Sequence, residues 1–335
     1  VAVTSTDVAG NATTQNLAAA VTIDTVAPTV ATTITGLSAD TGSSGADFIT
    51  KTASQNVSGS FTGTLGSGET IQVSADGSTW VSATTSGSTF TASGLTLVSG
   101  TNTLSVRTID AAGNVTSGTG HSYTLDTTAP TVSITSETSS NATSTLAKAG
   151  DVITASFTSA DPVTSVTIGG HAATVTNTSG NNYTATYTVQ SADNATSTAV
   201  AVTSTDVAGN ATTQNLAAAV TIDTVAPTVA TTITGLSADT GSSGADFITK
   251  TASQNVSGSF TGTLGSGETI QVSADGSTWV SATTSGSTFT ASGLTLVSGP
   301  NTLSVRTIDA AGNVTSGTGH SYTLDTTSPT VSITS

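Results

Sequence analysis

The 335-residue chain has no cysteine, no methionine, few aromatic residues and very few positive charges. The absence of cysteine excludes a disulfide scaffold, a thiolate metal site and a cysteine nucleophile. Only 5 residues are Lys or Arg against 20 Asp or Glu, which gives a net charge of −15. Nucleic acids and anionic membranes both select for Lys and Arg, so neither is an expected partner. No apolar run approaches the ~20 residues of a membrane-spanning helix, so we expect no membrane insertion by this segment.

The residues that are abundant favour β structure. Thr, Ser, Val, Ala and Gly dominate the chain, whereas strong helix formers are scarce. Apolar residues alternate with polar ones, as in Ile153, Ala155 and Phe157. About seven such short segments recur per ~100 residues, separated by Gly, Ser, Asn and Asp. The sequence therefore predicts an all-β fold of tandem immunoglobulin-like β-sandwich domains in an extended rod, with Trp80 and Trp279 as core anchors.

Two internal repeats define the expected domains. Residues 1–136 recur as residues 200–335 and differ only where Thr101 and Ala129 correspond to Pro300 and Ser328. An Asp-Thr-x-x-Pro phrase also recurs, and its proline indicates an extended linker. We therefore expect a piece of a longer array. It comprises the C-terminal part of a type A domain (1–24), a type B domain (25–126), a type A domain (127–223), a second type B domain (224–325) and the start of the next domain (326–335).

The acidic residues are mostly aspartates in recurring phrases. Besides the linker phrase, Asp-x-Ala-Gly-Asn occurs four times and Asp-[Phe/Val]-Ile-Thr three times. Sandwich topology places these phrases at the ends of domains, where carboxylates of neighbouring domains would meet with few cations to balance them. Oxygen ligands in that number, without Cys or His, are typical of Ca²⁺ sites. The predicted ligands are Asp24, Asp40, Asp47, Asp110, Asn114, Asp126, Asp151, Asp161, Asp206, Asn210, Asp223, Asp239, Asp246, Asp309, Asn313 and Asp325.

The alternative interpretation of these aspartates is structural. Asp and Asn are favoured in turns because their side chains hydrogen-bond to the nearby backbone. We expect this turn role for Asp76, Asp193 and Asp275, which lie outside the recurring phrases.

Taken together, the Asp-x-Ala-Gly-Asn hairpin, the Asp-Thr-x-x-Pro linker and the segment from Asp40 to Thr50 resemble tandem bacterial Ig-like domains. In particular, the chain resembles the extender regions of giant repetitive adhesins of the RTX type, which are exported by type I secretion. The resemblance covers the whole chain. It implies Ca²⁺ at the domain junctions, an extracellular location on the bacterial cell surface, and a spacer role.

Enzymatic activity is not expected. Asp40-Thr41-Gly42 and its repeat Asp239-Thr240-Gly241 look like aspartic protease signatures. A protease of this type brings both carboxylates close enough to share a proton. Here the two copies occupy equivalent positions in separate domains, so they are not expected to meet. No histidine has a nucleophile and a carboxylate repeated around it.

The function expected from the sequence is a calcium-rigidified structural spacer that projects a distal binding domain of a cell-surface adhesin. Its expected partners are the neighbouring repeats of the same chain, and the expected state is a monomer. Two alternatives remain open: a glycan- or receptor-binding Ig-like module, and an accessory module of a secreted enzyme.

Overall fold

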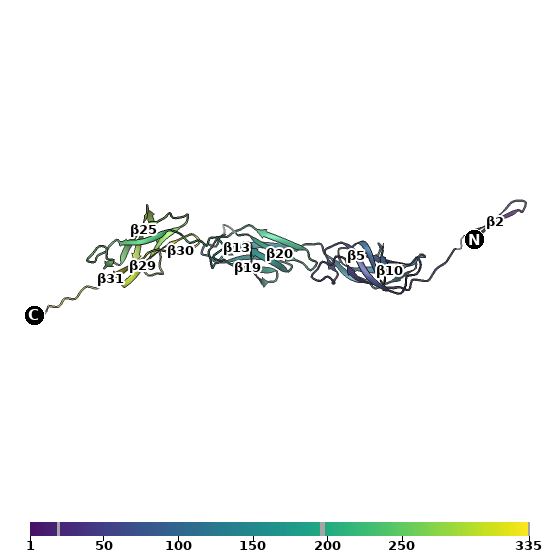
Figure 1. The fold of residues 1–335 in the computed structure, drawn as a ribbon, viewed down its shortest axis with the longest axis horizontal. Coiled ribbons are helices and arrows are strands. Elements are labelled where there is room, and N and C mark those ends of the chain that lie inside the picture. The colour runs from purple at the N-terminus through teal and green to yellow at the C-terminus, as the bar shows by residue number, and fades with distance from the viewer. Residues whose placement is uncertain (19–20, 195–197, 334–335) are drawn as a thin grey trace. The chain divides into compact units, whose positions relative to one another are not determined.

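The computed structural model describes residues 1–18, 21–194 and 198–333, and every regular element in these ranges is a β-strand (Figure 1). The all-β prediction is therefore confirmed. A search of the described residues for a helix long and apolar enough to cross a membrane gives none. The chain forms two compact units, Val1–Thr131 with Thr205–Thr212, and Val132–Ser204 with Thr213–Ser335.

The first type B domain contains one antiparallel and one mixed sheet, which form a sandwich. One has the order β3-β5-β9-β8 and the other β4-β12-β10-β6-β7, with β11 also paired to β10. The ten strands are more than the roughly seven that the sequence predicts. They are β3 (Ala31–Leu37), β4 (Ile49–Thr50), β5 (Ser54–Thr62), β6 (Thr70–Ser74), β7 (Val81–Ser82), β8 (Thr84–Ser86), β9 (Thr89–Thr96), β10 (Gly100–Ile109), β11 (Val115–Ser117) and β12 (His121–Leu125).

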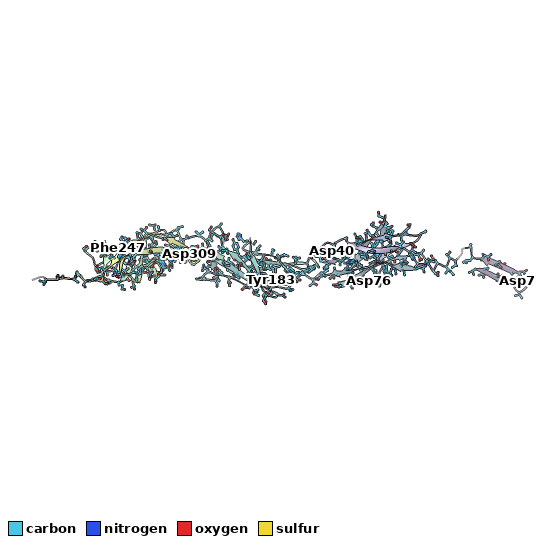
Figure 2. The ribbon with its side chains drawn as sticks, turned by 90° about the horizontal axis from the view of Figure 1, so that it is seen from below. Asp7, Asp40, Asp76, Tyr183, Phe247 and Asp309 are labelled. Carbon is cyan, nitrogen blue, oxygen red and sulfur yellow. The ribbon has the colours of Figure 1, made fainter. Side chains whose placement is uncertain are left out.

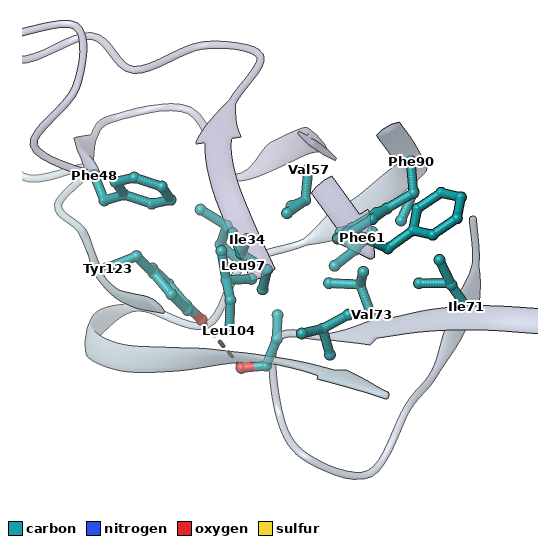
Figure 3. Close-up of a cluster of buried hydrophobic side chains, with 14 of the residues drawn as sticks. Ile34, Phe48, Val57, Phe61, Ile71, Val73, Phe90, Leu97, Leu104 and Tyr123 are labelled. Carbon is teal, nitrogen blue, oxygen red and sulfur yellow. Dashed lines mark hydrogen bonds between the residues drawn. The ribbon is translucent and has the colours of Figure 1, made fainter. Parts of the chain in front are cut away.

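The core of this domain lies between the two sheets. The alternating residues Ile71 and Val73 of β6 face Val57 and Phe90 of the other sheet, and all four are at most 1% exposed (Figure 3). The Tyr123 hydroxyl satisfies its polar end inside the core, because it donates to the Ala75 carbonyl at 3.2 Å and accepts from the Val98 N–H at 2.9 Å.

The segment that precedes the last strand bridges to β3 of the other sheet at Thr119. The Thr119 N–H donates to the Thr32 carbonyl at 2.7 Å, and the Thr119 carbonyl accepts from the Ile34 N–H at 3.1 Å. A Cβ on Gly118 would come within 2.5 Å of the Thr32 carbonyl oxygen, so this close approach needs glycine. Strand β12 then pairs in parallel with β4 and brings Asp126 beside it.

The prediction that Trp80 is a core anchor is wrong. Trp80 is only half-buried and does not belong to the core cluster. The guanidinium carbon of Arg107 lies 3.9 Å from its ring centroid, and Arg107 also donates to Gln72 Oε1 through Nε at 3.0 Å and Nη2 at 2.8 Å. Trp80 follows a turn and lies under an arginine, as does its repeat Trp279. The buried aromatic positions are taken by Phe90 and Tyr123 instead.

The turn before Trp80 contains Asp76 and confirms the structural role expected for this residue. Asp76 lies apart from Asp40, which is near the end of the domain where the chain leaves it (Figure 2). Asp76 accepts hydrogen bonds from the Thr79 N–H at 2.6 Å, the Ser78 N–H at 2.8 Å, the Thr79 hydroxyl at 2.8 Å and the Ser74 hydroxyl at 2.9 Å. The Thr79 N–H and the other donors hold the pKa of Asp76 well below its usual range.

A depressed carboxyl pKa predicts a specific pH dependence. The stabilisation from Asp76 is present above the ordinary carboxyl pKa of about 4 and is lost as the pH falls toward the lower folded value. We expect Asp76→Ala to unfold at lower urea concentration at pH 7 and to lose less stability than the wild type between about pH 4 and pH 2. Urea titrations of both proteins across this range check the result. Equal pH slopes for the two proteins would contradict it.

The second type B domain repeats the first. Strand β27 runs unbroken where β7 and β8 are separate, so it joins both sheets into one of nine strands, ordered β23-β25-β28-β27-β26-β29-β31-β24 with β30 on β29. The core uses the equivalent residues. The strands are β23 (Ala230–Leu236), β24 (Ile248–Thr249), β25 (Ser253–Thr261), β26 (Thr269–Ser273), β27 (Val280–Ser285), β28 (Thr288–Thr295), β29 (Gly299–Ile308), β30 (Val314–Ser316) and β31 (His320–Leu324).

The type A domain is a smaller sandwich of two four-stranded sheets, β13-β15-β19-β18 and β17-β16-β20-β21, with the short pair β14-β22. Ile153, Ala155 and Phe157 are at most 2% exposed, as their alternation predicts. The strands are β13 (Val132–Ser139), β14 (Leu146–Ala147), β15 (Val152–Ser159), β16 (Val163–Ile168), β17 (His171–Ala172), β18 (Thr174–Ser179), β19 (Asn182–Thr188), β20 (Val200–Thr205), β21 (Ala211–Leu216) and β22 (Thr221–Ile222).

Residues 1–17 form the antiparallel pair β1 (Ala2–Thr6) and β2 (Ala12–Asn16), whose sequence is identical to that of residues 200–216. In the type A domain, strand β20 of the same hairpin also pairs with β16, and Val202 is fully buried. In β1 the equivalent Val3 is 67% exposed. The two copies therefore show one hairpin with and without its surroundings.

Candidate functional site at the domain junctions

The exit loop of the first type B domain, residues 38–51, holds the predicted ligands Asp40 and Asp47. Asp40 Oδ2 accepts from the Phe48 N–H at 3.0 Å, and Asp47 Oδ1 accepts from the Ile49 N–H at 3.0 Å. The other carboxylate oxygen of Asp40, Oδ1, is buried and has no hydrogen-bond partner among the described residues. A buried carboxylate oxygen without a donor is destabilising, so a donor or a cation bound at this oxygen would stabilise the loop.

The charge state of Asp40 reflects this environment. Burial raises the pKa of the Asp40 carboxyl above its ordinary value, against the opposing hydrogen bond from the Phe48 N–H. The negative charge of Asp47 raises it further, because the two carboxylates lie close together. Ionisation of Asp40 therefore costs more in the folded domain than in the unfolded chain. The domain alone loses stability as the pH rises from the ordinary carboxyl pKa through the raised one.

The backbone beside the pair is strained. Phe48 has a φ of 61° and its repeat Phe247 a φ of 57°, the only non-glycine residues with positive φ among the described residues. This left-handed conformation costs of order 1–3 kcal/mol for a bulky residue. It is retained because it points the Phe48 N–H at Asp40 and stacks the Phe48 ring on His121, with centroids 3.7 Å apart. Strain that recurs beside a carboxylate pair is typical of a functional site.

The second type B domain repeats this arrangement. Asp239 Oδ2 accepts from the Phe247 N–H at 2.9 Å, and Asp239 Oδ1 is again buried without a partner in the part of the chain that is described. Asp246 accepts from the Ile248 N–H at 3.0 Å and the Ser243 N–H at 3.3 Å.

The linker aspartates form Asx turns. Asp126 Oδ1 accepts from the Thr128 N–H at 2.9 Å, and the same bond is made by Asp24, Asp223 and Asp325 at 2.8–3.0 Å. The Asp126 N–H donates to the Thr50 carbonyl at 3.0 Å, so the linker begins directly beside the exit loop. One oxygen of each linker carboxylate thus has a turn role, as the alternative interpretation expects.

The Asp-x-Ala-Gly-Asn hairpins close on themselves. In Asp206–Asn210, both carboxylate oxygens of Asp206 accept from Asn210, from its N–H at 2.8 Å and from its side-chain amide at 2.8 Å. Asp309 and Asp110 are bonded in the same way to Asn313 and Asn114. The Asn114 side chain is the main reason why the pKa of Asp110 is lowered. These aspartates are therefore already supplied with donors.

The same asparagines join each hairpin to the linker. The Asn210 amide donates to the Asp126 carbonyl and the Asn313 amide to the Asp223 carbonyl, each at 2.8 Å. Asn114 donates to the Asp24 carbonyl at 3.2 Å. The structure thus brings hairpin and linker together as predicted, through amide-to-carbonyl hydrogen bonds.

The predicted equivalence of Asp151 with Asp47 does not hold. In the type A domain, β14 takes the place of β4, because the Asp223 N–H donates to the Ala147 carbonyl at 2.8 Å. Asp151 comes after that strand, whereas Asp47 comes before its counterpart. Asp151 accepts from the Asn141 amide at 2.7 Å and the Lys148 N–H at 2.8 Å. The Asp161 backbone carbonyl accepts from the Ser159 and Ser204 hydroxyls at 2.7 and 3.2 Å.

Sequence reasoning missed the lysines of the junctions. Lys51, Lys148 and Lys250 each follow the short strand of the exit loop, and they recur at 97 and 102 residues, as the linker aspartates do. Lys51 Nζ donates to the Gly209 carbonyl at 2.6 Å, and Lys148 Nζ lies 3.9 Å from Asp151 Oδ1. Their spacing was the signal, because three of the five basic residues recur with the domain period.

The donor set fits a hard cation only in the type B exit loops. No group of three or more His, Cys, Asp or Glu side chains among the described residues is placed to hold a metal ion, so the predicted convergence of many carboxylates is not seen. The Asp40–Asp47 pair fits, because it offers a buried oxygen without a donor beside a second carboxylate, and Asp239 repeats the buried oxygen. Oxygen-only ligands of this kind suit Ca²⁺.

Residues 87–179 match a family of bacterial Ig-like domains, group 3. The match begins in the second half of the first type B domain, crosses the linker at Asp126 and ends in the type A domain. It covers less than half of the chain. No curated protein matches.

Solved structures with a similar arrangement include bacterial adhesins. The chain is 22% identical, at a TM-score of 0.43, to a Ca²⁺-stabilized adhesin with which an Antarctic bacterium binds ice, over 97% of this chain and 81% of that one. A 1.5-MDa bacterial ice-binding adhesin gives 18% identity and a TM-score of 0.38, over 90% and 99% of the chains. A tetra-tandem repeat from the extending region of a large adhesion protein gives 21% and 0.25, over 97% and 81%. The Ig-like match and the sandwiches described above establish an immunoglobulin-like all-β fold.

Proposed function

We propose that this chain is a non-enzymatic structural spacer of a bacterial cell-surface adhesin, in which Ca²⁺ strengthens the exits of the type B domains. The observation that carries the proposal is the exit loop of residues 38–51. It holds a carboxylate pair with a buried oxygen lacking a donor, and the Asp206–Asn210 hairpin of the next domain lies on the same loop. A repeated domain whose exit contacts its successor suits a spacer.

In this proposal Asp40 and Asp47 hold the ion in the first type B domain, and Asp239 and Asp246 hold it in the second. A bound Ca²⁺ supplies the positive charge that the pair lacks. The remaining predicted ligands, in the linkers, the hairpins and the type A domain, stay predictions. In the linkers and hairpins, carboxylate oxygens of these aspartates accept backbone N–H hydrogen bonds, and these bonds keep the turns closed with or without an ion.

The protein's own residues prepare the site. The left-handed Phe48 directs its N–H to Asp40 Oδ2, while Oδ1 is buried and accepts no hydrogen bond from the described residues. The Thr50 hydroxyl donates to the Ala39 carbonyl at 2.6 Å and so holds the chain beside Asp40 in place. A loop fixed in this way loses little conformational freedom when an ion binds, which favours binding.

Removing calcium from the purified chain tests the proposal. Extracellular Ca²⁺ modules bind with dissociation constants of about 10⁻⁴–10⁻³ M. At a free Ca²⁺ concentration about 100-fold above that constant, each site adds roughly 2.7 kcal/mol to the free energy of unfolding. We expect EDTA to lower the melting temperature of both type B domains.

Magnesium is the control ion, because its smaller octahedral site suits this carboxylate pair less well. We expect Mg²⁺ at the same concentration to restore less of the melting temperature than Ca²⁺. Melting temperatures of the type B domains that are the same in EDTA and in Ca²⁺ would refute the calcium part of the proposal.

A further inference from the structure

We propose that the exit loop of the type B domain is also a metal-independent docking surface for the Ala-Gly turn of the following type A hairpin, with the Lys51 ammonium as its built-in cation. We call Thr41, Ser43 and Lys51 the hairpin seat. The inference goes beyond the calcium proposal, because the contact uses protein donors only.

Three donors of the seat bind three consecutive carbonyls of the hairpin. The Ser43 N–H donates to the Val207 carbonyl at 3.2 Å. The Thr41 hydroxyl donates to the Ala208 carbonyl at 2.8 Å, and Lys51 Nζ donates to the Gly209 carbonyl at 2.6 Å. Carbonyls at the tip of a hairpin have no strand partner, so three in a row form a natural acceptor surface. The bond from the ammonium is charge-assisted and is the strongest of the three.

The two backbones approach so closely that only glycine fits on either side. A Cβ on Gly209 would lie 2.4 Å from the Thr41 carbonyl oxygen, and a Cβ on Gly42 would lie 2.6 Å from the Val207 carbonyl oxygen. The glycine of the Ala-Gly-Asn phrase is thus needed for docking as well as for the turn. The glycine of Asp-Thr-Gly, which resembles a protease signature, has the complementary role in the seat.

The chain contains an internal control for the effect of docking. The hairpin Asp7–Asn11 has the same sequence as Asp206–Asn210 and the same internal hydrogen bonds. Ala9 is exposed, whereas Ala208 is 1% exposed. Val8 and Val207 are 109% and 51% exposed. The hairpin alone therefore does not bury the alanine, which is buried only in the copy that has both its own domain and the seat around it.

The second compact unit contains a related contact with a different donor. At the exit of the type A domain, the Asn141 amide donates to the Ala311 carbonyl at 2.8 Å, and Ala311 is 2% exposed. Ala112, the equivalent residue of the other type B hairpin, is exposed. A Cβ on Gly312 would lie 3.4 Å from Lys148 Cε, so the lysine again covers the glycine. Both exits thus bury the alanine that precedes the glycine.

Spin labels on the full chain test the seat. The protein has no cysteine, so Ser60→Cys and Thr176→Cys place one label on an exposed strand of each of the two domains. In EDTA we expect a narrow distance distribution from the docked hairpin. Lys51→Met should reduce the ratio of docked to undocked molecules about tenfold or more, because a charged hydrogen bond is lost. Ala208→Leu should do the same, because the closed seat has no room for the larger side chain.

Each variant has a matched control of identical local sequence. Lys250→Met removes the same charge at the equivalent position, where Nζ has no partner among the described residues, and Ala9→Leu enlarges the exposed alanine. Both should leave the distribution unchanged. A broad distribution for the unmodified seat in EDTA, or equal effects of each variant and its control, would overturn the proposal. The two proposals are tested by separate measurements. If Ca²⁺ does not change the melting temperature, the ion site is refuted. The change in the distance distribution caused by Lys51→Met still tests the seat.

Discussion

Replacing Asp40 with asparagine is expected to raise the melting temperature of the first type B domain in EDTA and to abolish the further rise that calcium produces there. The two effects have opposite signs because they come from the same oxygen. Without an ion, the ionised Asp40 Oδ1 is buried without a donor and close to Asp47. Asparagine removes the charge and retains an oxygen that can accept from the Phe48 N–H.

The expected gain without metal is about 1 kcal/mol, at the lower end of the cost of an unsatisfied buried polar group. For a domain of this size it corresponds to roughly 4–8 °C in melting temperature. Asparagine should also flatten the pH dependence, because the wild-type domain loses stability as the pH rises through the raised pKa of Asp40. Calorimetry in EDTA and in Ca²⁺, from about pH 4, the ordinary carboxyl pKa, up to neutral pH, measures both effects.

Glu69→Gln is the matched control in the same domain. It removes one negative charge from a side chain that accepts the Gly66 N–H, at 2.9 Å, in a turn. We expect this control to leave the calcium response intact. If Asp40→Asn lowers the melting temperature in EDTA, the Asp40 carboxylate is stabilised within the protein. If the Asp40→Asn, Asp239→Asn double variant keeps a full calcium response, the ion binds at other residues.

The class of fold could be predicted because it depends on features that the sequence shows locally. Alternation placed Ile153, Ala155 and Phe157 in a core, and all three are buried. The prediction for Trp80 was wrong because alternation of apolar and polar residues indicates burial only for residues within a strand. Trp80 follows a turn, where an arginine from a neighbouring strand covers it.

The junctions could be predicted in part. The recurring phrases placed the Asp126 linker beside the exit loop and the Asn210 hairpin beside the linker, as found. Which oxygens remain without donors could not be predicted, because that depends on turn closure inside each phrase. The equivalence of Asp151 and Asp47 failed for a related reason. The two aspartates share only the four-residue phrase Asp-[Phe/Val]-Ile-Thr. This phrase does not show whether the aspartate precedes or follows the two-residue strand, because that strand is defined only by its pairing with the last strand of the domain.

Gly59→Ala is expected to be the most destabilising of the small substitutions considered for this chain. An ideal Cβ at position 59 would lie 2.1 Å from Cζ of Phe90 and 2.4 Å from the Thr33 carbonyl oxygen. Phe90 is 1% exposed and belongs to the core between the sheets, so its ring has no free space to enter. The alternative is a shift of the backbone of β3, which would disturb its pairing with β5.

Both ways of relieving the contact are costly, so we expect a loss of about 3 kcal/mol, at the upper end of the range for overpacked cores. This corresponds to a fall of roughly 12–24 °C in the melting temperature of the first type B domain. Gly45→Ala is the control, because its Cβ would meet no heavy atom within 4 Å and its φ is ordinary. The second type B domain, which keeps Gly258 in the same surroundings, serves as an internal reference in the same calorimetric scan. A Gly59→Ala protein that melts with the Gly45→Ala control would mean that β3 and Phe90 yield more easily than a close-packed sandwich allows.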